Sequence, residues 1–236
     1  MRARAAAGRG GAAARWLTAV GGVVTLALLA AGHAGPAGAA ARHGAATSAE
    51  GTPGQMIRVT TASYHTTYAK FTAYRRSGGR WVRVFGPWQA RIGYNGLAPP
   101  GKKREGDGRT PSGSYGFSFF FGVKPNPGVS FKYRHAYSYD VWDDDPASPR
   151  YNEWVDTRRH NPGASPEPMH QVPAYNYSAV ITYNASRVPG RGSAIFLHVG
   201  TGSATAGCVS LPERELLKVM RWLRPDRSPQ IRLHVR

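Results

Sequence analysis

The sequence predicts a mainly β fold, a sandwich or partly open barrel with one short C-terminal helix. Short runs of alternating or β-branched apolar residues recur from residue 57 to the C-terminus, and turn residues separate them. The chain holds 29 Gly and 18 Pro among 236 residues, which is typical of a fold rich in turns. One segment, residues 212–223, has clear helical periodicity. We therefore expect one β-rich domain over residues 57–236, large enough for a sizeable core.

The expected strands are marked by alternation or by β-branched composition. Residues 57–60 and 68–74 alternate, and a turn at 77–79 (SGG) leads to residues 81–85, which predicts a hairpin. Further strands are expected where aromatic or apolar runs lie between turn residues, at 88–92, 115–121, 178–183, 194–199 and 231–235.

The segment at 212–223 predicts a helix. Its apolar residues recur at helical spacing and would form one buried stripe: Leu216, Val219, Met220 and Leu223. Pro212 suits the first turn, because the first helical N–H groups have no intrahelical acceptor in any case. Ser210 and Glu213 have the spacing of a capping box, so we expect Ser210 to cap the helix.

Residues 143–171 contain five prolines and little apolar periodicity, which predicts a long loop. Its first three residues, Asp143 to Asp145, lack the alternating spacing of a calcium-binding loop, so a solvated or arginine-paired turn is the better interpretation. His160 and His170 lack the spacing of zinc ligands. We therefore expect neither a metal nor a cofactor.

The first 39 residues have the features of a secretory signal peptide. Four arginines precede an apolar run at residues 16–31, and residues 37–39 (AGA) form a small-residue cleavage pattern. The apolar run is short for a bilayer span, so an uncleaved anchor is the less favoured alternative. Residues 40–56 are small and polar, which predicts a flexible linker. We expect a secreted, cell-wall-associated monomer with no stable membrane span after cleavage.

The composition is strongly basic. The chain has 31 Lys and Arg against 13 Asp and Glu, a net charge of +18, and removal of the four leader arginines leaves +14. A secreted protein with this excess would concentrate on anionic cell-wall polymers. Nucleic acid is the other partner that such a charge suggests, but secretion and the lack of a clustered basic motif argue against it.

Cys208 is the single cysteine, so no internal disulfide can form. An unpaired thiol in an exported chain is bonded elsewhere, buried and inert, or reactive. His198 lies in an apolar run ten residues earlier, and a loop of small residues leads from it to Gly207 and Cys208. An imidazole beside the thiol would accept its proton, and Gly207 would leave backbone N–H groups open to an oxyanion. A core cysteine and a core histidine remain the alternative interpretation.

Two segments resemble motifs of one known family. Residues 205–210 (TAGCVS) resemble the Ser/Thr-x-Gly-Cys-hydrophobic-polar signature of the L,D-transpeptidase catalytic domain, the YkuD family. Residues 105–115 (EGDGRTPSGSY) resemble that family's earlier Gly-Asp-x-x-Thr-Pro-x-Gly-x-Tyr/Phe stretch. The motifs occur in the family's order, and the resemblance covers roughly residues 57–236.

The resemblance implies a β-rich catalytic domain that acts on peptidoglycan stem peptides. Cys208 would attack the carbonyl of the third stem residue and release D-alanine, and an amine of another stem would then accept the acyl group to give a 3→3 cross-link. His198 matches the proton acceptor and donor. Gly207 and Cys208 match the oxyanion-hole backbone, and Thr205 matches a residue that lines the site.

Three departures indicate a divergent branch and put substrate recognition in doubt. The interval between His198 and Cys208 is short for the family, Ala206 replaces a common His, and Ser210 stands where many members carry Arg or Asn. An L,D-carboxypeptidase with water as the acceptor and a non-catalytic cell-wall-binding module therefore stay open. A papain-like hydrolase is disfavoured, because its Cys precedes its His and here only His234 follows Cys208.

Overall fold

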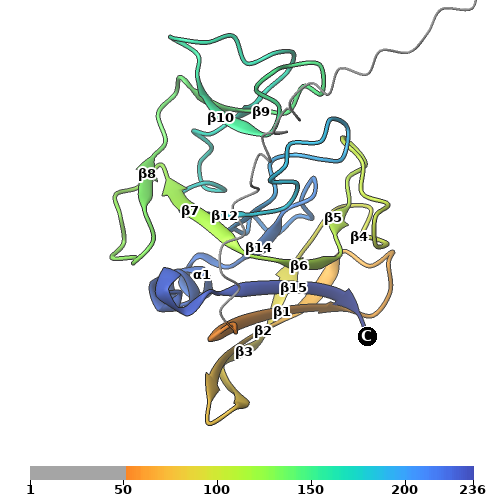
Figure 1. The fold of residues 1–236 in the computed structure, drawn as a ribbon, viewed down its shortest axis with the longest axis vertical. Coiled ribbons are helices and arrows are strands. Elements are labelled where there is room, and N and C mark those ends of the chain that lie inside the picture. The colour runs from red at the N-terminus through yellow and green to blue at the C-terminus, as the bar shows by residue number, and fades with distance from the viewer. Residues whose placement is uncertain (1–51) are drawn as a thin grey trace, which may run out of the picture. The chain divides into compact units, whose positions relative to one another are not determined.

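The computed structural model describes residues 52–236 (Figure 1). The signal peptide expected at 1–39 and residues 40–51 of the linker expected at 40–56 lie outside the described residues. Within the described part, the strands form a ten-stranded sheet, a three-stranded sheet and a two-stranded pair. In chain order the elements are β1 (Gln55–Thr61), β2 (Tyr68–Ser77), β3 (Arg80–Arg91), β4 (Leu97–Ala98), β5 (Thr110–Pro111), β6 (Gly113–Tyr115), β7 (Phe117–Gly122), β8 (Tyr133–His135), β9 (Asp140–Asp143), β10 (Glu153–Asp156), β11 (Glu167–Pro168), β12 (Ser178–Ile181), β13 (Phe196–Val199), β14 (Val209–Leu211), α1 (Glu213–Trp222), the 3-10 helix η1 (Pro225–Arg227) and β15 (Gln230–Val235).

The ten-stranded sheet has the strand order β6-β15-β1-β2-β3-β14-β13-β12-β7-β8. β1, β2 and β3 form an antiparallel meander, and β15 lies parallel to β1 on its other side. Ile57 and Val59 on β1 and Phe71 on β2 are fully buried, as alternation predicts for a sheet with one face on the core. β1 begins at Gln55, two residues before the domain boundary that composition suggests.

The two strands expected at 81–85 and 88–92 are one continuous strand, β3. Gly86 and Pro87 lie between them and have no partners in the ladder with β2, so the strand bulges here and then continues. Gly86 has a φ of 79°, and a Cβ at this position would lie 2.4 Å from the Phe71 carbonyl oxygen. The Gly-Pro pair therefore marks a bulge, which sequence alone does not distinguish from a turn.

Strands β13 and β14 carry two of the residues singled out by the sequence, His198 and Ser210. β13 and β14 are parallel neighbours, with His198 opposite Ser210. β14 joins the meander through a single residue pair, Ser210 with Arg91. The sheet is curled as a half-barrel (Figure 1).

Helix α1 lies where its periodicity predicts. Leu216, Val219 and Met220 are buried in the core. The expected capping box is wrong, because Pro212 is the N-cap residue and no side chain caps the helix by a hydrogen bond. Ser210 belongs to β14 instead, which places it in the sheet and not at the helix end.

Residues 143–171 are not a structureless loop. β10 and β11 lie within this range and pair with opposite edges of β9 to form the three-stranded sheet. β10 is four residues long and β11 is two residues long, and they carry charged residues or proline, so they have too little periodicity to be predicted from sequence. The loop prediction is wrong for these two segments.

Two clusters of buried side chains form the core. The larger cluster includes Phe71, Leu197 and the buried face of α1, and the smaller cluster includes Phe196, Tyr175 and Cys208. Residues 52–236 are mainly β with one α-helix, which confirms the predicted fold class. No helix in this part of the chain has the length and apolar character needed to cross a bilayer.

Candidate active site

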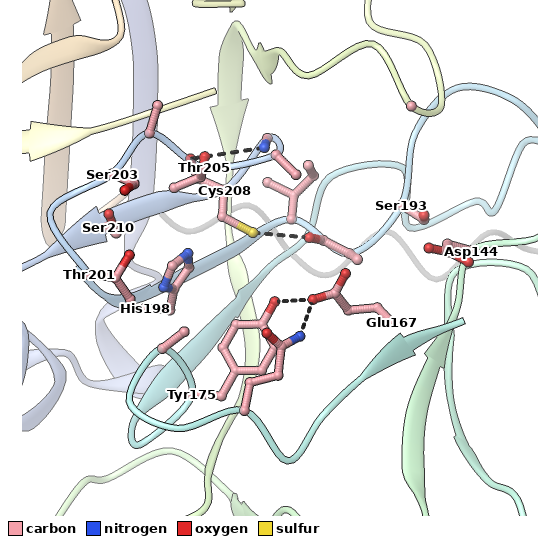
Figure 2. Close-up of a pocket in the computed structure, with 18 of the residues that line it drawn as sticks. Asp144, Glu167, Tyr175, Ser193, His198, Thr201, Ser203, Thr205, Cys208 and Ser210 are labelled. Carbon is pink, nitrogen blue, oxygen red and sulfur yellow. Dashed lines mark hydrogen bonds between the residues drawn. The ribbon is translucent and has the colours of Figure 1, made fainter. Parts of the chain in front are cut away.

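Cys208 and His198 are brought together by the parallel pair β13 and β14. Cys208 directly precedes β14, and Ser210, two residues later, pairs with His198. Because side chains two residues apart on a strand share a face, Cys208 and His198 lie on the same face of neighbouring strands. Both line a cavity of about 320 Å³, and Figure 2 shows the thiol and the imidazole within it.

The thiol of Cys208 is held in its neutral form by its surroundings. Its S–H donates to the Ala194 carbonyl at 3.2 Å, and the Phe196 N–H donates to Sγ at 3.3 Å. The side chain is almost fully buried, and burial raises the pKa of the Cys208 thiol to about 12. No hydrogen bond links the thiol to the imidazole of His198 in the structure of residues 52–236.

Ala194, whose carbonyl oxygen accepts the hydrogen bond from the thiol, has an uncommon backbone conformation. Its φ is 52°, which is uncommon for a residue with a side chain. Its N–H donates to Oδ1 of Asn152 at 3.2 Å, and the same oxygen accepts a hydrogen bond from the Trp142 indole at 2.9 Å. Asn152 therefore helps to fix the carbonyl that orients the thiol. The sequence did not indicate a role for Ala194 or Asn152 at the site, since neither belongs to a motif.

The imidazole of His198 is oriented as a neutral base. Its Nδ1 lies 2.8 Å from the Val199 carbonyl oxygen. A carbonyl can only accept a hydrogen bond, so Nδ1 carries the proton and Nε2 is free to accept one. The ring of Tyr175 packs edge-on against the imidazole, with ring centroids 5.5 Å apart. Burial lowers the pKa of His198 to about 4, so the ring is uncharged at neutral pH.

Two buried serines flank His198 in the sheet. Ser178 on β12 and Ser210 on β14 are its partners in register on the two sides. Both hydroxyls are buried, and neither has a hydrogen-bond partner. Buried hydroxyls usually have a hydrogen-bond partner, so these two hydroxyl groups next to the imidazole still have the capacity to form a hydrogen bond. Ser178 was not predicted, because in the sequence it is one small residue at the start of an apolar run.

The two sequence motifs meet at the carbonyl group of Cys208. The hydroxyl of Thr205 donates to this carbonyl at 2.7 Å, and the hydroxyl of Thr110 donates to it at 3.1 Å. Thr205 also accepts the Gly207 N–H at 3.2 Å. A Cβ at Gly207 would lie 3.2 Å from the Arg109 carbonyl oxygen, so the segments pack tightly. Thr110 explains physically why the 105–115 motif accompanies the cysteine motif.

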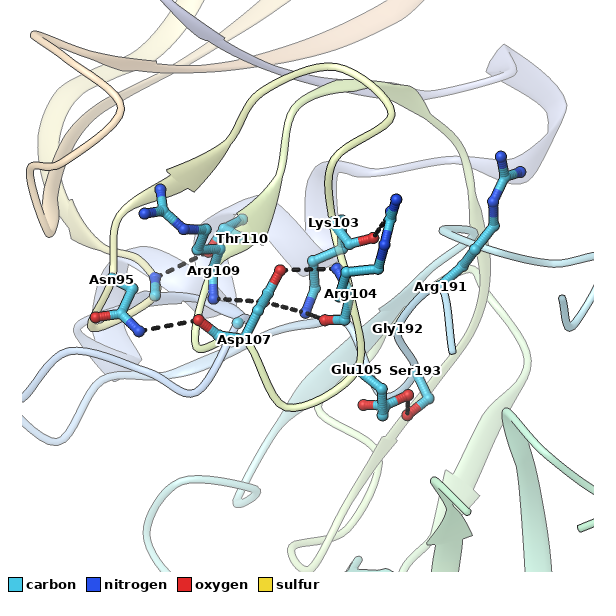
Figure 3. A network of polar contacts seen from close by, with 12 residues as sticks. Asn95, Lys103, Arg104, Glu105, Asp107, Arg109, Thr110, Arg191, Gly192 and Ser193 are labelled. Carbon is cyan, nitrogen blue, oxygen red and sulfur yellow. Dashed lines mark hydrogen bonds and ion pairs between the residues drawn. The ribbon is translucent and has the colours of Figure 1, made fainter. Parts of the chain in front are cut away.

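Asp107 organises the 103–110 segment beside the cavity (Figure 3). Its Oδ1 accepts hydrogen bonds from Lys103 Nζ at 2.7 Å and from the Arg109 N–H at 2.8 Å. Its Oδ2 accepts the Arg104 N–H at 2.7 Å. Lys103 is a buried cation, so this carboxylate also supplies the counter-charge that burial requires.

Replacement of Asp107 with Ala is expected to lower the free energy of unfolding by about 2–3 kcal/mol, because it leaves a buried lysine without its counter-charge and two N–H groups without an acceptor. Urea unfolding at pH 7 measures this change. Asp226→Ala is the matched control, since Asp226 pairs only with exposed arginines and its loss should change stability little. Equal stability of the two variants would contradict the role given to Asp107.

The cavity also contains three carboxylates that the sequence did not single out as site residues. Glu105 accepts hydrogen bonds from the hydroxyls of Tyr151 and Ser193. Glu167 accepts one from the Tyr175 hydroxyl at 2.8 Å. Asp144 lines the same cavity without a side-chain hydrogen bond. These residues come from three separate segments, so only the folded chain brings them together.

The prediction of a solvated or arginine-paired turn at residues 143–145 is wrong, because Asp143 is fully buried at the end of β9 and Asp144 and Asp145 are partly buried. Asp143 and Asp145 accept hydrogen bonds from neighbouring turn residues, but no arginine pairs with any of the three within the described chain. Burial, together with the negative charges of Glu105 and Glu167, raises the pKa of Asp144 to about 6. No group of three His, Cys, Asp or Glu residues in the described part is arranged to hold a metal ion.

All five residues named from the sequence line this one cavity: Cys208, His198, Gly207, Thr205 and Ser210. Residues 56–231 match the model of the L,D-transpeptidase catalytic domain, YkuD. The chain belongs to this family, which confirms the resemblance carried by its two motifs. It is thus a member of a family of peptidoglycan-related cell-wall enzymes.

One solved structure is similar, that of the helical cell shape determining protein Pgp2 from Campylobacter jejuni. The sequences are 15% identical, the TM-score is 0.36, and the match covers 76% of this chain and 46% of that one. The chain therefore spans about half the length of that protein. No curated protein matches the chain.

Proposed function

We propose that this chain is a secreted L,D-transpeptidase in which Cys208 attacks peptidoglycan stem peptides and His198 moves the protons. The observation that carries the proposal is the placement of both side chains on one face of neighbouring strands, in one cavity, inside a domain of this family. The hydrogen bonds from Thr110 and Thr205 to the Cys208 carbonyl support it further, because they hold the nucleophile's backbone in place.

In the first half of the reaction, the thiol turns away from the Ala194 carbonyl and Sγ attacks the carbonyl carbon of the third stem residue. The thiol proton passes to Nε2 of His198 as the S–C bond forms. The Gly207 N–H is engaged by Thr205, so the Cys208 N–H is the better oxyanion donor. The C–N bond to the terminal D-alanine then breaks, and the imidazolium gives its proton to the leaving amine. The products are a thioester and free D-alanine.

In the second half, a side-chain amine of another stem attacks the thioester. The new C–N bond forms as the C–S bond breaks, His198 takes a proton from the amine, and sulfur receives it to restore the thiol. The enzyme returns to its initial state, and the two stems are linked through a 3→3 amide bond.

Burial of both groups determines how the proton moves. It raises the pKa of Cys208 and lowers that of His198, so a separated thiolate and imidazolium are unfavourable before substrate binds. The resting pair is therefore neutral, and the proton transfer accompanies the attack. This arrangement protects the thiol from reagents that require a pre-formed thiolate.

Secretion and wall association are part of the proposal. The leader-like segment at residues 1–39 supports export, and the excess of basic residues suits anionic wall polymers as partners. We propose that the mature chain works as a monomer at the cell wall, without a metal or an organic cofactor.

The experiment is incubation of the chain without residues 1–39 with a stem tetrapeptide, followed by intact-mass analysis and separation of the products. The expected result is a tripeptidyl adduct on Cys208, stoichiometric release of D-alanine, and peptide dimers when an amine acceptor is present. Tripeptide monomers without dimers would assign water as the acceptor and make the enzyme a carboxypeptidase. If no adduct and no D-alanine appear, the chain is a binding module and the proposal fails.

A further inference from the structure

We propose that the outer face of strands β15, β1, β2 and β3 docks a linear cell-wall polymer whose charges are phosphodiester groups. These four strands are consecutive neighbours in the ten-stranded sheet (Figure 1). Four of their side chains carry the proposal, and we call them the cation row: Arg232, Arg58, Lys70 and Arg91. The surface lies outside the candidate active site, so the inference takes only the location at the cell wall from the proposed function.

Acidic residues are absent from these strands. Residues 52–104 and 227–236, which contain all four strands, hold no Asp or Glu. Every acidic residue of the chain except Glu50 lies between residues 105 and 226. The basic residues of the four strands therefore have no acidic side chain beside them, either along a strand or across the ladder.

The cation row crosses the four strands diagonally on one face. Arg232 is directly opposite Arg58 in the ladder of β15 and β1. Lys70 is two residues from the partner of Arg58 on β2, and Arg91 is two residues from the partner of Lys70 on β3. Residues two apart on a strand share a face, so consecutive members of the row are separated by about 5–8 Å.

This face points away from the core. The alternate residues of the same strands, such as Val59 and Phe71, are fully buried. Lys70 and Arg232 are exposed, and Arg58 and Arg91 are half-buried. The charged ends of the row are therefore available to a partner.

The row is oriented but not neutralised. The guanidinium of Arg58 lies over the ring of Tyr74, 4.9 Å from its centroid, and that of Arg91 lies over the ring of Tyr68 at 3.8 Å. Within residues 52–236, no ion pair includes any member of the row. Like charges on neighbouring strands repel, and a bound polyanion would remove this repulsion.

Two grooves on these strands provide a second observation. One has a volume of about 510 Å³ and is lined by Arg58, Arg232 and His234, and the other has a volume of about 430 Å³ and is lined by Lys70 and Arg236. No Asp or Glu side chain lines either groove. A linear polymer can lie in such grooves, and the planar arginine fork matches the oxygens of a phosphate group.

Nucleic acid and a lipid bilayer suit this face less well. Guanidinium groups cover the rings of Tyr68 and Tyr74, so these rings are not open platforms on which bases stack. Among the exposed large apolar side chains of the described chain, only Tyr68 and Val82 lie on the four strands. The face therefore offers charge to a partner and little apolar surface for insertion into a bilayer.

The cation row ends next to the candidate active site. Arg91 is the partner of Ser210 in the ladder between β3 and β14, and Ser210 lines the cavity that holds Cys208. A polymer bound along the row would therefore keep the mouth of the cavity close to the wall without entering the reaction.

The test measures binding of a fluorescently labelled glycerol-phosphate oligomer to the chain without residues 1–39, by anisotropy over a range of salt concentrations. We expect the double variant Arg58→Gln with Arg232→Gln to weaken binding about tenfold at about 0.15 M salt. We also expect it to lower the slope of log Kd against log salt by about 1.4, or about 0.7 for each lost phosphate contact. Thermal unfolding checks that the variant is folded.

The matched control is the double variant Lys132→Gln with Arg214→Gln, which removes the same net charge. Both residues are exposed and form no ion pair in the described chain. Arg214 lies on α1, which packs on the core side of the sheet, and Lys132 directly precedes β8 at the other end of the strand order. At about 0.15 M salt, charges more than about 8 Å away are largely screened, so binding should change less than about twofold.

Three results would overturn the inference. Equal loss of affinity in the two double variants would show that net charge alone binds the oligomer. Tighter binding of single-stranded DNA of the same charge through the same residues would assign the face to nucleic acid. Tighter binding of phosphatidylglycerol vesicles would assign it to a membrane surface.

Failure of this inference is distinguishable from failure of the proposed function. The oligomer assay can be run on the Cys208→Ala chain, so it does not depend on catalysis. The Arg58 and Arg232 double variant should release D-alanine from a soluble stem tetrapeptide at the rate of the original chain. Oligomer binding without any adduct on Cys208 would end the proposed function and keep the docking face, and the reverse result would do the opposite.

Discussion

Cys208→Ala is expected to abolish the release of D-alanine from a stem tetrapeptide, with a loss of at least about 10⁴-fold in kcat/KM. Without Sγ no thioester can form, and direct attack by water lacks the covalent step that divides the reaction into two easier ones. The fold should persist, because alanine fills most of the volume of the buried cysteine and a destabilisation of about 1–2 kcal/mol is typical of such a change. Product release, measured by chromatography, checks the first claim and thermal unfolding checks the second.

A second variant, Cys208→Ser, distinguishes loss of the nucleophile from loss of the fold as the cause of inactivity. Cys208→Ser keeps a group that can donate to Ala194 and accept from the Phe196 N–H, so its stability should be close to that of the original chain. Its activity should nevertheless be almost as low as that of the alanine variant, because a hydroxyl is a far weaker nucleophile than sulfur. D-alanine release at an undiminished rate in either folded variant would show that Cys208 is not the nucleophile.

His198→Gln is expected to lower the acylation rate at pH 7 by about 10²–10⁴-fold, the usual contribution of a general base. The pH dependence should change as well. In the original chain the imidazole has a pKa of about 4, so it is available as a base throughout the range from pH 5 to 8 and the rate should vary little there. In the variant only ionised thiol reacts, and since the thiol pKa is about 12, the rate should rise about tenfold per pH unit.

Single-turnover acylation followed by mass spectrometry between pH 5 and 9 measures both profiles. His170→Gln serves as the control, because His170 is exposed and does not line the cavity, and it should leave rate and profile unchanged. If the His198 variant keeps the flat profile of the original chain, another group accepts the thiol proton and the role given to His198 is wrong.

Much of the fold follows from local pattern. The spacing of apolar residues shows which side of a strand or helix is buried. This signal is local, and it is present as alternation at residues 57–60 and 68–74 and as helical spacing at 212–223. The elements that sequence did not predict lack this signal. β10 and β11 are short and polar or proline-containing, and the continuation of β3 through Gly86 depends on a partner strand distant in sequence.

The candidate nucleophile and base were also readable from sequence, because Cys208, Gly207 and His198 lie in one continuous stretch of chain. Their partners were not. Thr110 donates to the Cys208 carbonyl although it lies 98 residues away in the sequence. Ser178 lies beside His198 only because β12 pairs with β13. Ser210 has the right spacing for a helix cap, but its strand pairs with β13 and β3, and the sheet determines its role.

By itself the sequence determined the fold class, the family and the segment that carries the thiol and the imidazole, since these depend on neighbouring residues. Only the tertiary structure decided the charge states and the surroundings. The depth of burial that keeps both groups neutral, and the meeting of Glu105, Asp144 and Glu167 in one cavity, are properties of packing between distant segments. Desolvation and electrostatic repulsion act through space, so no local pattern in the chain records them.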